Sequence, residues 1–144
     1  MGCTFCGIVD GSTPAHVVWK GEYALAFLDT RPVFPGHTLV VPRAHVETLP
    51  ELADDLLAPL FSAVRLLSAA MPAAMQAHGT FVAVNNKVSQ SVPHLHVHVI
   101  PRRFKDGLRG FFWPRQRYDD EAHAAEVAEV VRRAVGEVGE QALR

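Results

Sequence analysis

The sequence predicts an α+β domain built on a mostly antiparallel β-sheet. Short strand-like runs lie on both sides of one long helical pattern, and a second helical pattern follows them. The composition is 49% hydrophobic and 20% charged, a balance typical of globular proteins. Because 144 residues correspond to one ordinary domain, we expect a single domain over residues 1–144.

Four short runs rich in apolar residues predict the strands of this sheet. The first three are 23–29, 37–41 and 80–84, each bounded by Gly, Pro or Asn. A turn-rich loop over 31–36 joins the first two runs. The fourth run, 94–100, alternates histidine with aliphatic residues.

Apolar residues at helical spacing predict one long helix over 55–77 and a second helix over 120–138. Asp54 or Asp55 is expected to cap the start of the long helix, and Pro72 to kink or end it. The apolar stripe of the long helix comprises Leu56, Leu60, Val64, Leu67 and Met71. The stripe of the second helix comprises Val127, Val130, Val131, Ala134, Val135 and Val138.

The near-neutral charge argues against two classes of protein. The chain has 14 Lys and Arg and 15 Asp and Glu, a net charge of 14 − 15 = −1. Proteins that coat duplex nucleic acid or membrane surfaces carry many excess basic residues, so we expect no stable nucleic-acid binding. The sequence shows neither a membrane-length apolar run nor a secretory signal pattern. Two cysteines without such a signal suggest a reducing compartment, and the expected location is the cytoplasm.

The run 94–100 reads His-Leu-His-Val-His-Val-Ile. In a strand, this alternation places His94, His96 and His98 on one face and the aliphatic residues on the other. The aliphatic face can pack on the helix, while the imidazole face is available to a ligand. At about 3.3 Å per residue the outer two histidines are about 13 Å apart, too far for one small ion to bind all three. We therefore expect the histidines to have different roles.

The stretch 90–102, which contains this run, resembles the signature of the histidine triad nucleotide hydrolases and transferases. Residues 27–29 and 35–42, followed by His45, are similar to the ribose-side loop and second strand of that family. The resemblance covers residues 3–117, most of the chain. It implies a five-stranded, mostly antiparallel sheet with one long helix and a C-terminal helix, and a homodimer.

The resemblance also implies roles for individual residues. In the family, a histidine attacks the α-phosphorus of a nucleotide and forms a nucleotidyl-histidine that water later cleaves. His96 matches this nucleophile, and Asp29 matches the acid that binds the ribose hydroxyls. The implied catalytic set is His96, His98, His37 and Ser91. The implied nucleotide-binding set is Phe27, Asp29, Asn85, Gln90, Ser91, His96 and His98.

An alternative reading and two departures from the family pattern affect this assignment. Asp29 also fits a turn-initiating Asp at the end of a strand. The family commonly has Gly before the glutamine, where this sequence has Ser89, and a side chain there restricts the backbone of the phosphate loop. The segment 85–88 is also shorter than in many members, which weakens the match of Asn85.

Cys3 and Cys6 form a Cys-x-x-Cys pair, which alone is a weak signal. A thioredoxin-like site needs a βαβ unit that this sequence does not show, and two free thiols are the simplest alternative. The resemblance implies a zinc site, because some bacterial-type members bind zinc through such a pair and two histidines. The implied ligands are Cys3, Cys6, His45 and His94. Such a closed Cys₂His₂ set suits a structural tetrahedral zinc.

The segment 102–117 combines six basic residues with Phe111, Phe112 and Trp113. Its charge is explained either by attraction of phosphate or by an ordinary solvated surface. Its aromatic residues fit an interface with a second copy, and they fit ordinary core packing nearly as well.

Together these residues predict a nucleotide-binding hydrolase or nucleotidyltransferase. The expected substrates are AMP-linked phosphoramidates or dinucleoside polyphosphates, as the resemblance implies. Two alternatives stay open: a non-catalytic nucleotide-binding or interaction module, and a metal-dependent hydrolase with triad histidines as ligands. Binding alone needs no nucleophile, which argues against the first. The Cys₂His₂ set argues for a structural metal and so against the second.

Overall fold

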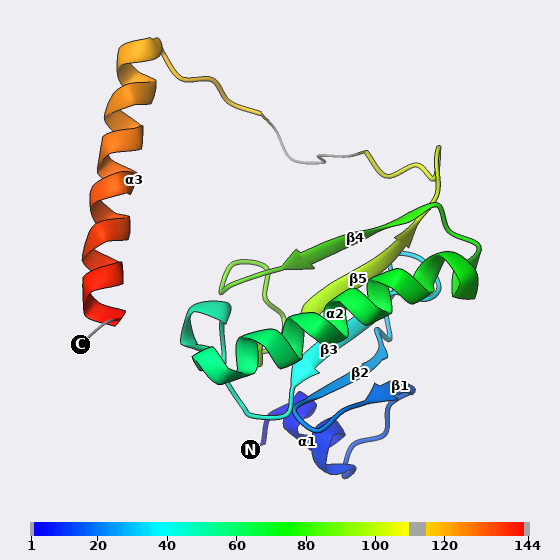
Figure 1. Cartoon of the computed structure of the whole chain (residues 1–144). Helices are drawn as coiled ribbons and strands as arrows, with labels where there is room; N and C mark the ends of the chain where they lie inside the picture. Colours follow the sequence, from blue (N-terminus) through cyan, green and yellow to red (C-terminus); the bar gives the residue numbers. More distant parts are fainter. Residues whose placement is uncertain (1, 110–114, 143–144) are drawn as a thin grey trace. The chain divides into compact units, whose positions relative to one another are not determined.

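The computed structural model describes residues 2–109 and 115–142 (Figure 1). The chain divides into two compact units, Met1–Asp106 and Gly107–Arg144, and each is described by itself. The predicted aromatic run 111–113 lies outside the described residues. The expectation of a single domain over 1–144 stays a prediction.

The first unit contains a five-stranded sheet in the order β1-β2-β3-β5-β4, with every neighbouring pair antiparallel. Its strands are β1 (Val17–Lys20), β2 (Ala24–Leu28), β3 (Thr38–Pro42), β4 (Gly79–Val84) and β5 (Val97–Arg102). Its helices are α1 (Thr4–Asp10), a short 3-10 helix (Leu49–Glu51) and α2 (Asp54–Met75). The predicted α+β class with an antiparallel five-stranded sheet is therefore confirmed.

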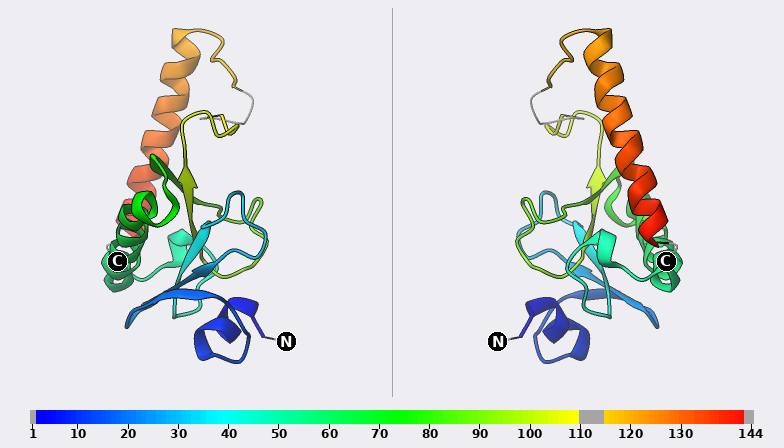
Figure 2. Two further views of the ribbon diagram at one scale, coloured as in Figure 1. Left: turned by 90° about the vertical axis from the view of Figure 1, so that its right-hand side faces the viewer. Right: turned by 90° about the vertical axis from the view of Figure 1, so that its left-hand side faces the viewer.

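Helix α2 lies across one face of the sheet (Figures 1 and 2) and contacts β2, β3, β4 and β5. Its buried side chains follow the predicted stripe and share one apolar core with Val97 and Val99 of β5. The length and composition of α2 would suffice for a membrane span, but this buried face makes it the core helix of the unit. The buried residues of α2 are Leu60, Ala63, Val64, Leu67 and Met71.

The predicted cap of α2 is wrong, and Pro72 does not end the helix, while a kink at Pro72 stays a prediction. The cap position is Ala53, which has no side-chain hydrogen bond, so Asp54 and Asp55 lie in the first turn. There their negative charges still favour the positive end of the helix dipole. Pro72 lies inside the helix, which continues to Met75 and ends at Gln76 in the left-handed conformation.

The opposite face of the sheet carries a second apolar cluster that includes Phe5 of α1. Its sheet residues alternate along the strands with those that face α2, as the two-residue period of a strand requires. These buried sheet residues are Leu25, Phe27, Leu39 and Val41.

The sequence reasoning missed α1 and β1, and both are short. Helix α1 has 7 residues and β1 has 4, and β1 shows no alternation of buried and exposed side chains. Neither length gives a periodic pattern that can be distinguished from a loop. The cap of α1 is Cys3, whose sulfur accepts a hydrogen bond from the backbone N–H of Cys6.

Strand β5 begins at Val97, so the predicted strand 94–100 starts three residues too early. The backbone before Val97 leaves the ladder: the N–H of Leu95 donates instead to the carbonyl oxygen of Val46, at 2.7 Å. The predicted alternation still holds for the aliphatic residues, because Leu95, Val97 and Val99 are all fully buried against α2.

The second unit contains helix α3 (Glu121–Ala142), which confirms the predicted C-terminal helix and extends it by four residues. The apolar stripe of α3 is largely exposed: the side chains of Val130, Val131, Val135 and Val138 are each more than half accessible.

Candidate functional site

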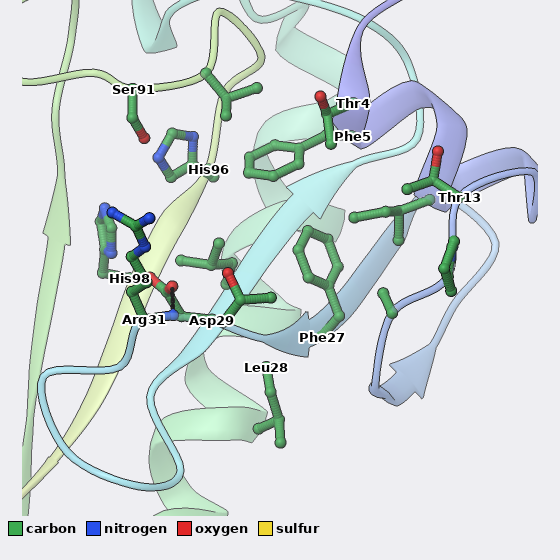
Figure 3. A pocket seen from close by; sticks show the side chains of 16 residues that line it. Thr4, Phe5, Thr13, Phe27, Leu28, Asp29, Arg31, Ser91, His96 and His98 are labelled. Atoms are coloured by element: carbon green, nitrogen blue, oxygen red, sulfur yellow. Dashed lines mark hydrogen bonds between the residues drawn. The ribbon is translucent and has the colours of Figure 1, made fainter.

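A cavity of about 480 Å³ opens between α1, the end of β2, the loop after β2 and the histidines around the start of β5 (Figure 3). One wall is apolar and comprises Phe5, Ile8, Phe27, Leu39 and Val92. The polar end of the cavity includes Asp29, Arg31, Ser91, His96 and His98. An apolar wall beside a polar end suits a ligand that combines an apolar ring with charged groups.

His96 is buried, and a neighbouring backbone group determines which of its ring nitrogens carries the proton. Its Nδ1 lies 2.8 Å from the carbonyl oxygen of His94. A carbonyl oxygen only accepts hydrogen bonds, so Nδ1 carries the proton and Nε2 of the neutral ring holds a free lone pair. The ring edge of His96 packs against Phe5, with the two centroids 5.2 Å apart. The local backbone therefore prepares one nitrogen of His96 as a nucleophile.

His37 and His98 form a hydrogen-bonded pair whose direction is also set by the backbone. The N–H of Val33 donates to Nδ1 of His37 at 3.0 Å, so the neutral ring of His37 carries its proton on Nε2. That Nε2–H donates to Nδ1 of His98 at 2.9 Å. His98 must then carry its own proton on Nε2. The pair thus presents an N–H donor from His98, which lines the cavity.

Both histidines of this pair are held neutral by their surroundings. Burial, with smaller contributions from His96 and His37, lowers the pKa of His98 to about 4. Burial also lowers the pKa of His37, and the negative charge of Asp29 opposes that shift. A neutral pair can donate a hydrogen bond to a phosphoryl oxygen without competing for a proton near pH 7.

Asp29 follows β2 and faces this pair. Its Oδ1 accepts the backbone N–H of Arg31 at 2.8 Å, and its Oδ2 lies 3.6 Å from Nε2 of His37. The carboxylate is only 21% exposed. Asp29 therefore makes the predicted turn and also lines the cavity, and its contact with ribose stays a prediction.

The other predicted site residues separate into two groups. Phe27 and Ser91 line the cavity, and the hydroxyl of Ser91 points toward the ring of His96 in Figure 3. Asn85 and Gln90 are not among the lining residues. The side chain of Gln90 instead donates to the carbonyl oxygen of Glu47 at 2.6 Å and accepts the N–H of Lys87 at 2.8 Å.

The phosphate-side loop contains Ser89 in the left-handed conformation, with a φ of 60°. This is the region that glycine occupies without penalty, which explains why glycine is common here in the family. Asn85 is exposed, and its side-chain amide donates to the carbonyl oxygen of Ser89 at 3.4 Å. The phosphate-binding roles of Asn85 and Gln90 stay predictions.

Several lining residues were not predicted as site residues from the sequence, among them Phe5, Ile8 and Arg31. Phe5 stands between the two cysteines, so its position near a metal pair was an available signal. Arg31 is two residues after Asp29 and places a positive charge at the polar end of the cavity. Ile8 had no signal, because α1 itself was not predicted.

The four predicted metal ligands come together beside the cavity, with their ligand atoms within 4.8 Å of one another. Nδ1 of His94 lies 3.2 Å from Nδ1 of His45 and 3.4 Å from the sulfur of Cys3. The sulfur of Cys6 lies 3.3 Å from Nδ1 of His45 and 3.6 Å from Nδ1 of His94. A tetrahedral zinc requires N–N edges of about 3.3 Å and N–S edges of about 3.6 Å. The donor set therefore fits this metal.

The tautomer of His94 suits the same assignment. Its Nε2 lies 2.9 Å from the carbonyl oxygen of Pro42, so Nε2 carries the proton and Nδ1 faces the thiols with a lone pair. A backbone acceptor that orients a ligating imidazole in this way is typical of zinc sites.

A second group of donors, Asp29, His37 and His98, also lies within 4.8 Å of one another. Here the backbone opposes a metal. The N–H of Val33 points at Nδ1 of His37, so the nitrogen that faces the group is protonated. A metal at that nitrogen would require the opposite tautomer and would bring two N–H groups into conflict. The arrangement favours a hydrogen-bonded relay, in which Val33 donates to His37 and His37 donates to His98.

Comparison with known proteins agrees with this geometry. The model of the HIT domain family matches residues 10–105. A HIT family protein from Bacillus subtilis has a crystal structure that is 34% identical, with a TM-score of 0.83, covering 92% of this chain and 96% of that one. A zinc-bound histidine triad protein from Mycobacterium smegmatis is 32% identical, with a TM-score of 0.72 over 92% and 97% of the two chains.

A curated relative carries a named activity. The adenosine 5'-monophosphoramidase hnt1 of Schizosaccharomyces pombe is 32% identical over 115 residues, which are 79% of this chain and 84% of that protein. The family match spans well over half of the chain and includes the whole sheet, the cavity histidines and Asp29. The chain therefore belongs to the HIT, or histidine triad, family of nucleotide-binding hydrolases and transferases.

Proposed function

We propose that this protein transfers a nucleotidyl group from its substrate to His96 and then to water. The observation that most directly supports this proposal is the hydrogen bond between Nδ1 of His96 and the carbonyl oxygen of His94. It leaves the lone pair of Nε2 in a cavity whose other groups are suited to a nucleotide. A module that only binds nucleotides has no need for a nucleophile prepared in this way.

In the first step, Nε2 of His96 attacks the α-phosphorus and a nitrogen–phosphorus bond forms. The bond from phosphorus to the leaving atom breaks, and the bonding electron pair departs with that atom. The leaving atom takes up a proton, for which the Ser91 hydroxyl is the nearby donor. The Nε2–H of His98 keeps its proton and stabilises negative charge on the phosphoryl oxygens.

In the second step, water attacks phosphorus, releases Nε2 of His96 and yields the nucleoside monophosphate. The proton that water loses returns to the oxygen of Ser91, which restores the hydroxyl used in the first step. An acceptor other than water would make the protein a transferase by the same route.

We propose AMP-linked phosphoramidates and dinucleoside polyphosphates as the substrate class. The apolar wall to which Phe5 and Phe27 contribute suits a base, and Asp29 is suited to accept hydrogen bonds from ribose hydroxyls. The phosphoramidase activity named for the Schizosaccharomyces pombe relative supports an adenosine substrate with a P–N bond.

We also propose a structural zinc at Cys3, Cys6, His45 and His94. The edge lengths of that donor set support it, as does the zinc-bound neighbour from Mycobacterium smegmatis. Zinc here would stabilise the folded chain and hold α1 beside the sheet, with no open position for substrate. We also propose that the protein forms a homodimer and is located in the cytoplasm.

The test is the detection of the covalent intermediate. The wild-type protein is mixed with a panel of AMP-linked substrates, quenched with base, under which phosphohistidine survives, and analysed by peptide mass spectrometry. We expect the mass of AMP less water on the peptide that contains His96. His96→Ala should lose turnover and the adduct, while His96→Gly should still bind AMP. Normal turnover by His96→Ala would refute the mechanism.

A further inference from the structure

The carboxylate of Asp29 contacts the histidine pair at the protonated nitrogen that links the two rings. Nε2 of His37 lies 2.9 Å from Nδ1 of His98 and 3.6 Å from Oδ2 of Asp29. Nδ1 of His98 accepts the proton of that nitrogen at hydrogen-bond distance. The carboxylate lies just beyond hydrogen-bond distance and places a negative charge beside the same nitrogen.

The position of this carboxylate is determined by two backbone hydrogen bonds. The N–H of Asp29 donates to the carbonyl oxygen of His37 at 2.9 Å, which sets the two residues opposite each other where β2 ends and β3 begins. Oδ1 is used by the N–H of Arg31, so Oδ2 is the oxygen that faces His37. A side chain needed only for ribose would not require this registration against the catalytic pair.

We propose that Asp29 is a positioning residue for the catalytic histidines and acts on His98 through His37, in addition to its contact with ribose. The inference rests on the proposed function and deepens it. Asp29 exchanges no atom with the substrate. In the attack step the bond from His96 to phosphorus forms and the bond to the leaving atom breaks, with its electron pair departing on that atom.

The effect of Asp29 is exerted on charge and orientation. As negative charge develops on the phosphoryl oxygens, the N–H of His98 strengthens its hydrogen bond to them, and Nδ1 of His98 becomes a better acceptor for the N–H of His37. The negative charge of Asp29, 3.6 Å from Nε2 of His37, stabilises the tautomer that carries the proton on that nitrogen and so keeps the proton of His98 on its Nε2. The carboxylate also opposes rotation of the His37 ring, since the N–H of Val33 and Oδ2 of Asp29 hold its opposite edges.

Asp29→Asn isolates this role, because it removes the charge and keeps the turn. The amide oxygen of Asn still accepts the N–H of Arg31, and an NH₂ group then faces His37 in place of Oδ2. Asp10→Asn is the matched control. Asp10 forms the same turn, accepting the N–H of Ser12 at 2.8 Å, and it does not line the nucleotide cavity.

The experiment compares adenosine 5'-phosphoramidate with its 2',3'-dideoxy counterpart. The dideoxy substrate lacks the hydroxyls that a ribose-binding carboxylate would hold. We expect Asp29→Asn to lower kcat on the dideoxy substrate by about ten- to a hundredfold, with Asp10→Asn like the wild type. Equal kcat of Asp29→Asn and the wild type on the dideoxy substrate would overturn the inference and leave the proposed function intact.

A second measurement does not depend on turnover. Ring nitrogen chemical shifts of the histidines report protonation and hydrogen bonding directly. We expect Asp29→Asn to shift the resonances of His37, which the carboxylate approaches to 3.6 Å, and of His98, which accepts the hydrogen bond from His37. An unchanged His98 would overturn the relay. Failure of the wild type to turn over either substrate would instead refute the proposed function.

Discussion

Replacing His98 by Asn is expected to make the protein less sensitive to acid between pH 7 and pH 5. Burial near His96 and His37 lowers the pKa of His98 from 6.5 to about 4 in the folded chain. The unfolded chain returns to the ordinary value, so between these two pKa values only the unfolded chain binds the proton. Acid therefore favours unfolding, and this contribution to stability is lost as the pH falls through 6.5 toward 4.

The size of the effect follows from the two pKa values. At pH 5 the unfolded chain is almost fully protonated at this position and the folded chain is almost fully neutral. The linkage amounts to about 2 kcal/mol of unfolding free energy, compared with a few tenths at pH 7. Burial also lowers the pKa of His37, so acid lowers the unfolding free energy through His37 in the wild type and in His98→Asn alike.

The measurement is urea unfolding of the wild type and His98→Asn at both pH values. We expect the wild type to lose about 2 kcal/mol more than the variant between pH 7 and pH 5. Protonation of the metal ligands acts on both proteins and cancels in this difference. His16→Asn, at an exposed histidine, should behave like the wild type. Equal losses in the wild type and His98→Asn would refute the reasoning.

Two further predictions concern stability. Chelation should lower the melting temperature by roughly 10 °C, because a metal held a thousandfold above its Kd contributes about 4 kcal/mol, and added zinc should restore it. Loss of turnover on chelation with an unchanged melting temperature would favour the metal-dependent alternative. Ser89→Gly should raise the unfolding free energy by about 1 kcal/mol in urea, because Ser89 adopts a φ of 60°. A less stable Ser89→Gly protein would show that the side chain, rather than the strain, dominates there.

Local patterns in the sequence were enough for the regular parts of the fold. Helix α2 and strands β2, β3 and β4 differ from their predicted bounds by one or two residues, because each has a clear period or clear turn residues at its ends. Strand β5 was placed three residues early, since the alternation of residues 94–100 continues into backbone that leaves the ladder.

Local patterns in the sequence were also enough to identify the family and to name candidate site residues. The alternation around His96, the Cys-x-x-Cys pair and the acid after the first predicted strand are local features, and they are sufficient to assign the family. They do not specify which nitrogen of each cavity histidine carries the proton, or which residues form the apolar wall of the cavity. Phe5 and Ile8 were missed because α1 is too short to show a period.

The tertiary structure adds which partners each histidine contacts and which of its ring nitrogens carries the proton. His94 meets Cys3 across 91 positions of sequence, and His37 meets His98 across 61. The lone pair of His96 and the N–H of His98 are directed by carbonyl and N–H groups of the folded backbone. Hydrogen-bond direction depends on atoms brought together by folding, and no period or spacing along the chain encodes it.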